Sequence, residues 1–250
     1  MKKPLVSIIT PTYNSSKFIN ETVQSVRNQT YQNFEHIIVD DCSSDNTWMI
    51  LEDLEKEDSR IKLLRMDKNS GAALARNQAI QLAKGKYIAF LDSDDLWEPR
   101  KLELQVQFMH NNNIAFSFTN YKMIDENGQD LNRVVTCPEV INYKDLLKNT
   151  TIGCLTVMID IDKIDKLVMP NLQPEDTALW LKILKKGYNA YCLQESLACY
   201  RIVTNSVSSN KWIVAKRMWR VYRNSEKLNV FSSFWYFLNY AWNAVKKHYL

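Results

Sequence analysis

Four clusters of polar residues follow short apolar segments in the first hundred residues. These clusters are Pro11–Asn14, Asp40–Asp45, Asp67–Gly71 and Asp92–Asp95. In the last cluster, Asp92-Ser93-Asp94 places two carboxylates two residues apart on a turn. Carboxylate ligands favour Mg²⁺ or Mn²⁺, which usually keep several waters and take the oxygens of a diphosphate. The structural alternative is a turn whose aspartates cap the helix that follows.

Two other residues in these clusters have side chains suited to holding a nucleobase. Tyr13 offers a flat aromatic face, and Asp41 can accept a hydrogen bond from a base N–H or from a ribose hydroxyl. The structural alternative is that Asp41, or Ser43 beside it, caps the next helix.

The segments around the clusters alternate between strand and helix patterns. Short β-rich apolar runs occupy residues 5–10, 34–39, 61–65 and 86–91, and helical patterns between them occupy 15–29, a segment capped by 43–45, and 72–84. This alternation predicts an α/β fold, with a mainly parallel sheet and helices on both faces. The carboxyl ends of parallel strands meet at one edge, where ligands bind in open α/β sheets. We therefore expect the four clusters to converge.

The second half of the chain is less regular. Its patterns predict helices, strands and one hairpin turn, in the order helix 99–111, strand 114–124, turn 126–129, strand 155–159, helix 175–186, and strands 188–193 and 197–202. No repeat or low-complexity linker interrupts residues 1–210, which we treat as one domain, with 211–250 as a tail.

Composition excludes several kinds of site. Glycine is scarce, at 5 of 250 residues, and neither a G-x-G-x-x-G turn nor a Walker loop is present to hold phosphates. The five cysteines lack C-x-x-C spacing and there are three histidines, which argues against a zinc cluster and favours reduced thiols in a cytoplasmic protein. The N-terminus has no signal-peptide pattern.

Four motifs in order connect the chain with a family. They are Thr10-Pro11-Thr12-Tyr13-Asn14, Val39-Asp40-Asp41-Cys42-Ser43-Ser44-Asp45-Asn46-Thr47, Asn69-Ser70-Gly71-Ala72-Ala73-Leu74-Ala75-Arg76-Asn77 and Phe90-Leu91-Asp92-Ser93-Asp94-Asp95. Together they resemble the family 2 glycosyltransferases, which have the GT-A fold. The resemblance is dense over 4–110 and looser to 210. It is to bacterial members that build capsular or cell-wall polysaccharides, such as the teichuronic acid enzymes.

The resemblance implies a nucleotide-sugar-binding half, residues 1–97. The residues that it implies for binding the nucleotide-sugar donor are Pro11, Tyr13, Asp41, Asn69, Arg76, Asp92 and Ser93. Within this set, Tyr13 would stack on uracil, Asp41 would contact its N–H edge, and Arg76 would reach the base or the diphosphate. Asp94, with Asp92, would ligate Mn²⁺ or Mg²⁺, which offsets the charge of the leaving diphosphate.

The resemblance also implies an acceptor half, residues 98–210, that supplies a general base. Asp176, next to Glu175, would take the proton of the acceptor hydroxyl while that oxygen displaces the diphosphate and inverts the anomeric carbon. Trp180 would line the acceptor sugar, and Arg201 or Lys211 would approach the diphosphate. The structural alternatives are that Asp176 is an acid favoured by the helix dipole, that Trp180 is a core residue and that Arg201 is a surface residue. A Q-x-x-R-W motif is absent, so we expect transfer of a single sugar.

The tail differs from the body in charge. Residues 1–210 hold 24 of the 32 basic side chains and 27 of the 28 acidic ones, and the tail has four of the seven tryptophans. On a helical projection the first part of the tail has two stripes. The basic stripe is Lys216, Arg220, Arg223 and Lys227, and the aromatic stripe is Trp212, Ala215, Trp219 and Tyr222. The second part has a polar stripe of Ser232, Tyr236, Asn239 and Asn243.

These stripes predict amphipathic helices that lie on an anionic membrane. The enzyme would then be cytoplasmic and peripheral on the inner face of the cell membrane, beside a glycan or lipid-linked acceptor. The alternatives for the tail are a helix packed on the body, a homodimer contact, or a membrane span, since 228–245 carries no charge.

Two other functions compete with sugar transfer. A sugar nucleotidyltransferase would need a Gly-rich, basic loop after the first strand, which 11–15 lacks. A non-catalytic module whose tail binds nucleic acid would have no use for the acidic set, and the body is net acidic, so we expect no nucleic-acid partner.

Overall fold

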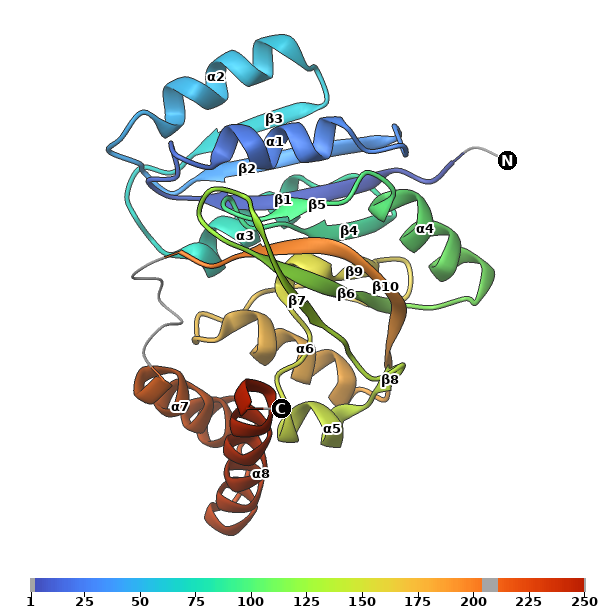
Figure 1. Ribbon diagram of the computed structural model, residues 1–250, viewed down its shortest axis with the longest axis vertical. Coiled ribbons are helices and arrows are strands. Elements are labelled where there is room, and N and C mark those ends of the chain that lie inside the picture. Colours follow the sequence, from blue (N-terminus) through green and yellow to red (C-terminus); the bar gives the residue numbers. More distant parts are fainter. Residues whose placement is uncertain (1–2, 204–210, 250) are drawn as a thin grey trace.

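A computed structural model of the chain describes residues 3–203 and 211–249, and within the second range it describes the side chains of 212–243. The predicted alternation in the first hundred residues is confirmed (Figure 1). The elements are β1 (Val6–Thr12), α1 (Ile19–Arg27), β2 (Phe34–Asp40), α2 (Thr47–Glu57), β3 (Ile61–Arg65), α3 (Ala72–Leu82) and β4 (Tyr87–Phe90).

The rest of the body adds further strands and three α-helices to this unit. In chain order they are β5 (Leu96–Trp97), α4 (Lys101–Asn111), β6 (Phe116–Ile124), β7 (Asp130–Val135), β8 (Val140–Ile141), α5 (Tyr143–Lys148), a 3₁₀ turn (Cys154–Thr156), β9 (Met158–Asp160), α6 (Glu175–Lys185) and β10 (Ala190–Arg201). The predicted turn at 126–129 joins β6 to β7, which pair as an antiparallel hairpin.

One sheet connects both halves of the body. Its order is β3-β2-β1-β4-β9-β6-β10-β5, with β7 beside β6 and β8 beside β10. The strands β3, β2, β1 and β4 are parallel, as predicted, and β6 is parallel to β10. Between these parallel groups, β9 runs antiparallel to both β4 and β6.

Helices cover both faces of the parallel strands, and β2 shows why. Ile38 packs in a cluster with α1 and α2, whereas Ile37 and Val39 belong to the main core with the alanines of α3. Successive strand residues point to opposite faces, so an unbroken apolar strand needs cover on each side. The prediction of an α/β sheet covered on both faces is confirmed.

Two expectations for the second half are corrected. Trp180 of α6 is fully buried, with its ring centroid 5.4 Å from that of Phe90 and 5.2 Å from that of Phe116. The prediction that Trp180 lines the acceptor is therefore wrong, because it fills the core between α6, β4 and β6. The two strands expected at 188–193 and 197–202 are one strand, β10, whose register against β6 shifts at Ser196. Such irregularities interrupt the alternation that sequence reading depends on.

The tail forms two helices, and its inner side packs on the body. They are α7 (Lys211–Arg220), continued by a π-helical turn (Val221–Ser225), and α8 (Val230–Tyr249). Tyr222 is fully buried and its hydroxyl donates to the Leu147 carbonyl at 2.7 Å. Buried Glu226 accepts from the Tyr143 hydroxyl at 2.7 Å and pairs with Lys185 Nζ at 3.1 Å. Among the described residues, no helix is both long and apolar enough for a membrane crossing.

This packing predicts that the tail contributes to the stability of the fold. Replacing the buried Tyr222 by Ala removes its contacts and its hydrogen bond, and we expect a loss of about 3–5 kcal/mol in the free energy of unfolding. The control is Trp212→Ala, whose side chain is 81% exposed and whose loss we expect to be within ~0.5 kcal/mol. Urea unfolding of the full chain followed by circular dichroism measures both. Equal effects of the two substitutions would contradict the packing.

Candidate active site

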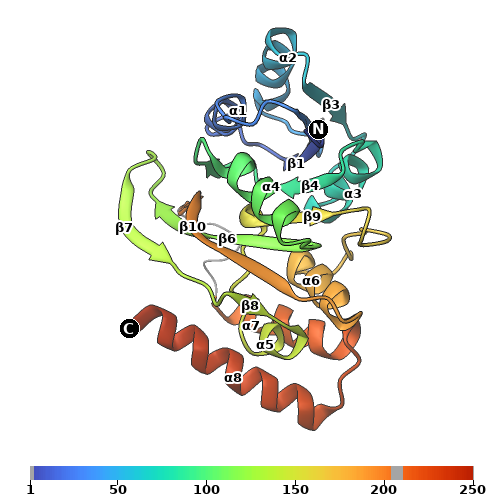
Figure 2. The same cartoon turned by 90° about the vertical axis from the view of Figure 1, so that its right-hand side faces the viewer.

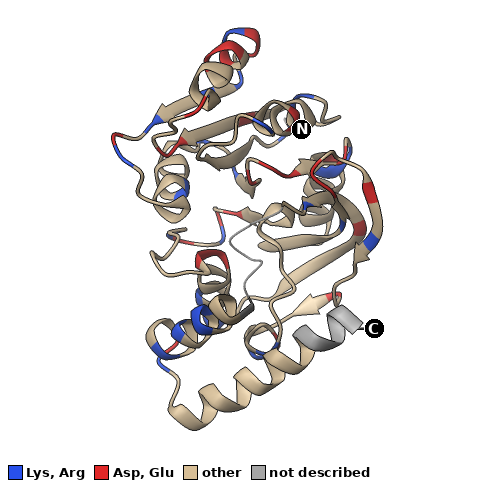
Figure 3. Ribbon diagram, turned by 60° about the vertical axis from the view of Figure 1, so that its left-hand side comes forward, with Lys and Arg blue, Asp and Glu red and all other residues tan. Residues whose placement is uncertain are grey.

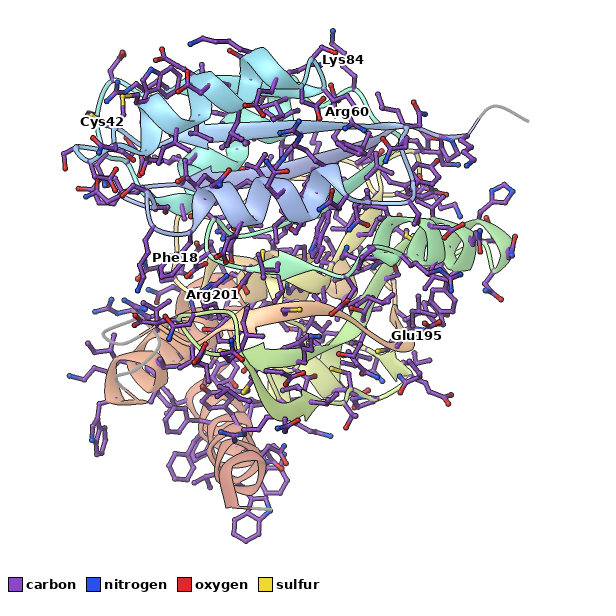
Figure 4. The ribbon with its side chains drawn as sticks, turned by 45° about the horizontal axis from the view of Figure 1, so that its top comes forward. Phe18, Cys42, Arg60, Lys84, Glu195 and Arg201 are labelled. Atoms are coloured by element: carbon purple, nitrogen blue, oxygen red, sulfur yellow. The ribbon has the colours of Figure 1, made fainter. Side chains whose placement is uncertain are left out.

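The four polar clusters lie along one edge of the sheet, because the parallel strands that precede them all end on that side. The connecting segments are 13–18, 41–46, 66–71 and 91–95. Figure 4 shows Phe18 and Cys42 on this side of the molecule, and Arg60 and Lys84, from the turns at the opposite edge, on the other. The predicted convergence of the four clusters is thus observed.

Hydrogen bonds join the segments after β1 and β2. The backbone N–H of Asn14 donates to Ser43 Oγ at 2.9 Å, and the N–H of Ser44 donates to the side-chain oxygen of Asn14 at 2.9 Å. Asn14 has a φ of 49°, a left-handed conformation in which Asn is enriched over most residues. Next to it, Tyr13 is 48% exposed, so its ring is available to a ligand from solvent.

Asp41 joins the segment after β2 to the segment before α3. Its carboxylate is buried and accepts hydrogen bonds from the N–H groups of Ser70 and Gly71, each at 2.7 Å. Neither Asp41 nor Ser43 caps α2, whose first residue, Thr47, donates its backbone N–H to Asp45 Oδ1 at 3.0 Å. An ionised carboxylate has about four acceptor positions, so the contact between Asp41 and a base stays a prediction.

Three other residues predicted to bind the donor differ in exposure. Pro11 is buried in β1 opposite Val39, and Asn69 is exposed. Ser93 is half-buried, with its Oγ 2.8 Å from Ser15 Oγ. Their contacts with a donor also stay predictions.

Arg76 of α3 lies between two carboxylates from distant parts of the chain. Its Nη2 is 2.5 Å from Asp92 Oδ1, and its Nη1 is 2.7 Å from Glu175 Oε1. Burial alone would lower the pKa of Arg76, but the negative charges of Asp92 and Glu175 raise it above its usual value. The guanidinium is buried and held by both carboxylates, and its contact with the base or diphosphate stays a prediction.

Asp92 and Asp94 differ in how their charges are balanced. Asp92 is paired with Arg76, whereas burial, and then the charge of Asp92, raise the pKa of Asp94 to about 6. Within the described ranges, no group of three or more acidic, His or Cys side chains is placed to hold a metal ion. The protein therefore offers two carboxylates here, which is the usual protein share at a Mg²⁺ that also binds substrate phosphates.

Arg201 does not reach the site, so its predicted approach to the diphosphate is wrong. Its side chain is fully buried next to Phe18 (Figure 4). Nε donates to the Asp94 carbonyl at 2.6 Å, Nη1 donates to the Glu126 carbonyl at 3.0 Å, and Nη2 pairs with Glu21 at 2.7 Å. The guanidinium instead holds the chain just after the Asp92-Ser93-Asp94 turn in place. Residues 206–208 and the Lys211 side chain lie outside the described residues.

The sequence did not single out Asp95, which supports the same turn. Its buried carboxylate accepts the backbone N–H of Arg201 at 2.8 Å, and its carbonyl accepts the Thr22 hydroxyl at 2.9 Å. Burial, and then the charge of Asp94, raise the pKa of Asp95 well above its usual value. Its place directly after the Asp-x-Asp turn was the available signal.

Asp176 lies on the first turn of α6, next to Glu175. Burial, and then the charge of Glu175, raise the pKa of Asp176 to about 6, although its Oδ1 accepts the Thr177 N–H at 2.6 Å. The carboxylate is half-buried. It is ionised at pH 7 but more basic than an aspartate in water, which suits a group that accepts a proton.

A second contact, also missed from sequence, holds α3 against the segment before α6. The side-chain amide of Asn77 donates to the Met169 carbonyl at 2.9 Å and accepts the Met169 N–H at 2.8 Å. With Arg76, it ties the donor side of the site to the element that carries Asp176.

Two cavities lie elsewhere on the described surface and contain none of the predicted site residues. One, of about 440 Å³, lies between α1 and the β6–β7 hairpin, and the other, of about 700 Å³, lies beside α4. The charged groups of the first are already paired, since Lys122 lies 2.7 Å from Glu98 and Glu21 is bound to Arg201. The sheet edge is therefore the better candidate for catalysis.

The Arg76 contacts predict strong coupling between the two sides of the site. Arg76→Met leaves the Asp92 and Glu175 carboxylates without their cation, and we expect a loss of about 3–5 kcal/mol in the free energy of unfolding at pH 7. The double variant Arg76→Met/Glu175→Gln should be more stable than the single one, because one uncompensated charge is gone. Urea unfolding of the four proteins of this cycle measures the coupling. Additive losses would show that the pair is not coupled.

Comparison with known proteins gives the same assignment as the motifs. The family described as "Glycosyl transferase family 2" matches residues 7–159. The chain is 52% identical to the putative teichuronic acid biosynthesis glycosyltransferase TuaG of Bacillus subtilis, over 98% of each chain. It is 44% identical to the Escherichia coli UDP-Glc:alpha-D-GlcNAc-diphosphoundecaprenol beta-1,3-glucosyltransferase WfgD, over 98% of this chain and 95% of the relative.

Solved structures share the fold at lower identity. TarS of S. aureus in complex with UDP-GlcNAc has a TM-score of 0.70 at 22% identity, over 91% of this chain and 69% of TarS. The mannosyltransferase PcManGT from Pyrobaculum calidifontis, in complex with GDP-Man and Mn²⁺, has a TM-score of 0.68 at 17% identity, over 92% of this chain and 66% of that one. With its fold, its motifs and these relatives, the chain belongs to the family 2 glycosyltransferases and is a glycosyltransferase of the GT-A fold.

Proposed function

We propose that this enzyme is an inverting glycosyltransferase that transfers one sugar from a UDP-sugar to a glycan or lipid-linked acceptor in bacterial surface polysaccharide synthesis. The observation that carries the proposal is the position of Asp176, a carboxylate on the first turn of α6 that Arg76 and Glu175 connect to the Asp-x-Asp turn. The names of the relatives support the substrate classes, since WfgD is named for a UDP-glucose donor and a diphosphoundecaprenol-linked acceptor.

The donor would bind at the edge formed by residues 1–97. Tyr13, half-exposed, would stack on the base, and the remaining acceptor positions of Asp41 would meet the base N–H. Pro11, Asn69 and Ser93 would complete this side of the site. The acceptor would bind against residues 98–210, on the side of α6.

A divalent cation fits the residues at the Asp-x-Asp turn. Asp94, with Asp92, would hold Mn²⁺ or Mg²⁺, because the Asp94 carboxylate is half-buried and Arg201 binds the backbone carbonyl of Asp94 instead of this carboxylate. When bound, the ion supplies positive charge to the leaving diphosphate. The structure of PcManGT, named with Mn²⁺, supports a divalent metal in this fold.

Asp176 would act on the acceptor. Its carboxylate accepts the proton of the acceptor hydroxyl, the oxygen bonds to the anomeric carbon, and the bond from that carbon to the diphosphate oxygen breaks with its electron pair leaving on the nucleoside diphosphate. Because the attack comes from the face opposite the diphosphate, the configuration at the anomeric carbon inverts. A lipid-linked acceptor also implies that the enzyme works at the inner face of the cell membrane, with 211–250 in peripheral contact with anionic lipid.

The base is tested by Asp176→Asn. The amide oxygen can still accept the Thr177 N–H, and an ionised Asp176 with a raised pKa destabilises the folded state at pH 7, so we expect unfolding stability at least equal to wild type. UDP binding by calorimetry should be unchanged, and the transfer rate should fall by about 10²–10⁴-fold. Asp53→Asn, at an exposed acid of α2, is the matched control. Transfer by Asp176→Asn near the wild-type rate would remove Asp176 from the mechanism.

The pH profile gives an independent test of the same residue. Below about pH 6 Asp176 is protonated and cannot accept a proton, so the wild-type rate should fall about tenfold per pH unit there. The pKa reflects burial together with the charges of Glu175, Arg76 and Asp92. At a saturating metal concentration, which keeps Asp94 ionised, residual transfer by Asp176→Asn should lack this decline. A residual rate with the same acid limb would assign the limb to another group.

Metal dependence is tested by chelation. EDTA should abolish transfer, and excess Mn²⁺ or Mg²⁺ should restore it, since the chain itself offers two carboxylates and no further ligand cluster among its described residues. Asp94→Asn should need a higher metal concentration for half-maximal rate and for metal-dependent UDP binding. Full activity in EDTA would exclude this role for Asp94.

A further inference from the structure

The helix α8 has two faces in different surroundings. On the inner face, Ser233 is buried, Tyr236 lies against Tyr222 with ring centroids 6.5 Å apart, and the Asn243 amide donates to the Lys148 carbonyl at 3.1 Å. Residues from the predicted polar stripe therefore lie toward the body. Figure 2 shows α8 running along the outside of α5 and α7, so its opposite face has no described element over it.

The outer face of α8 is apolar along its described length. Its side chains recur at helical spacing and are 49–89% exposed; they are Phe231, Phe234, Trp235, Leu238 and Trp242, which we term the aromatic face. An amphipathic helix packed on a soluble body normally turns such a stripe inward. Contiguous exposed apolar side chains of this kind mark an interaction site.

Exposed cations accompany the aromatic face. Lys216 and Arg220 of α7, and Lys227 in the turn before α8, are exposed. The tail has one acid, Glu226, which is buried and paired with Lys185. The exposed described surface of 212–243 thus combines aromatic and basic side chains with no exposed acid, which complements an anionic surface.

The position of the two helices relates this surface to the site. In Figure 3, α7 with its blue basic positions lies below the start of α6, whose first turn is red; the acids of that turn are Glu175 and Asp176. A flat surface in contact with α8 and the exposed side of α7 would therefore lie at the acceptor end of the molecule, below the element that carries Asp176.

We propose that the aromatic face of α8, together with Lys216, Arg220 and Lys227, is a docking surface for an anionic lipid bilayer. The helix lies in the plane of the headgroups, with its Trp and Phe side chains inserted and the cations at the phosphate level. The bilayer is favoured over a second copy of the chain because its charge complements the cations, whereas a copy would place like charges together. This proposal specifies which residues make the membrane contact of the proposed function. Only the biological purpose of the contact, access to a lipid-linked acceptor, rests on the proposed function.

The test measures vesicle binding by the full chain without substrates. Co-sedimentation uses phosphatidylcholine vesicles with and without phosphatidylglycerol, and tryptophan fluorescence follows the insertion. We expect the anionic vesicles to be bound more tightly, with a blue shift. Phe231→Ser/Trp235→Ser/Trp242→Ser should weaken binding by about 100-fold. Lys216→Gln/Arg220→Gln/Lys227→Gln should weaken binding to the anionic vesicles by about 100-fold as well.

The control removes exposed apolar side chains elsewhere on the molecule. Met49→Ser/Val134→Ser changes two residues that are each 57% exposed, on α2 and β7, and should bind like wild type. Unchanged binding by the aromatic variant overturns the proposal. The proposal is also overturned if the wild-type chain binds no vesicles and is a dimer in sedimentation velocity, while the aromatic variant is a monomer.

The outcome is separable from that of the proposed function. Asp176→Asn should bind vesicles like wild type, and the aromatic variant should transfer sugar to a water-soluble acceptor at the wild-type rate. Vesicle binding without any transfer by wild type would contradict the proposed function and leave the docking surface in place. Sugar transfer by a wild-type protein that binds no vesicles would contradict the docking surface and leave the proposed sugar transfer in place.

Discussion

A buried guanidinium between two carboxylates is the interaction on which the site depends. Arg76 cannot be moved without leaving the half-buried carboxylates of Asp92 and Glu175 unpaired, an arrangement that proteins tolerate poorly. Asp92 stands at the end of β4 and Glu175 at the start of α6, so one side chain sets the relative position of a strand end and a helix end that are far apart in the sequence. The sheet and the packing of α3 on β1 and β2 then hold Arg76 itself.

This pairing also divides the acids of the site into two groups. Asp92 and Glu175 share the positive charge of Arg76, and Asp41 accepts hydrogen bonds from the N–H groups of Ser70 and Gly71. Asp94 and Asp176 have no such cationic partner, and the pKa of each is raised to about 6. The paired acids maintain the structure, and the two that remain are the ones to which the proposed chemistry gives a cation and a proton.

Local patterns in the sequence were sufficient for the first half of the fold. Each strand and helix up to β4 was predictable, because apolar periodicity and polar strand ends are properties of neighbouring residues. Trp180 and Arg201 were predicted wrongly, since their surroundings come from β4, β6, α1 and the β6–β7 hairpin, which approach only in the folded chain. The stripes of the tail were visible as patterns, but which stripe faces the body depends on contacts with α5 and with Tyr222.

The clamp between Asn77 and Met169 has a consequence for how such enzymes can diversify. Asn77 binds only the backbone of Met169, but the Met169 side chain is itself buried in the main core, as are Ile164 and Leu167. Together with the ionic contact to Glu175, it anchors the second part of the segment 161–174, and the core constrains the apolar positions within that segment. Recombination between relatives could therefore exchange this segment, provided that the incoming piece keeps its length, keeps apolar residues at positions 164, 167 and 169, and is followed by an acid that Arg76 can reach.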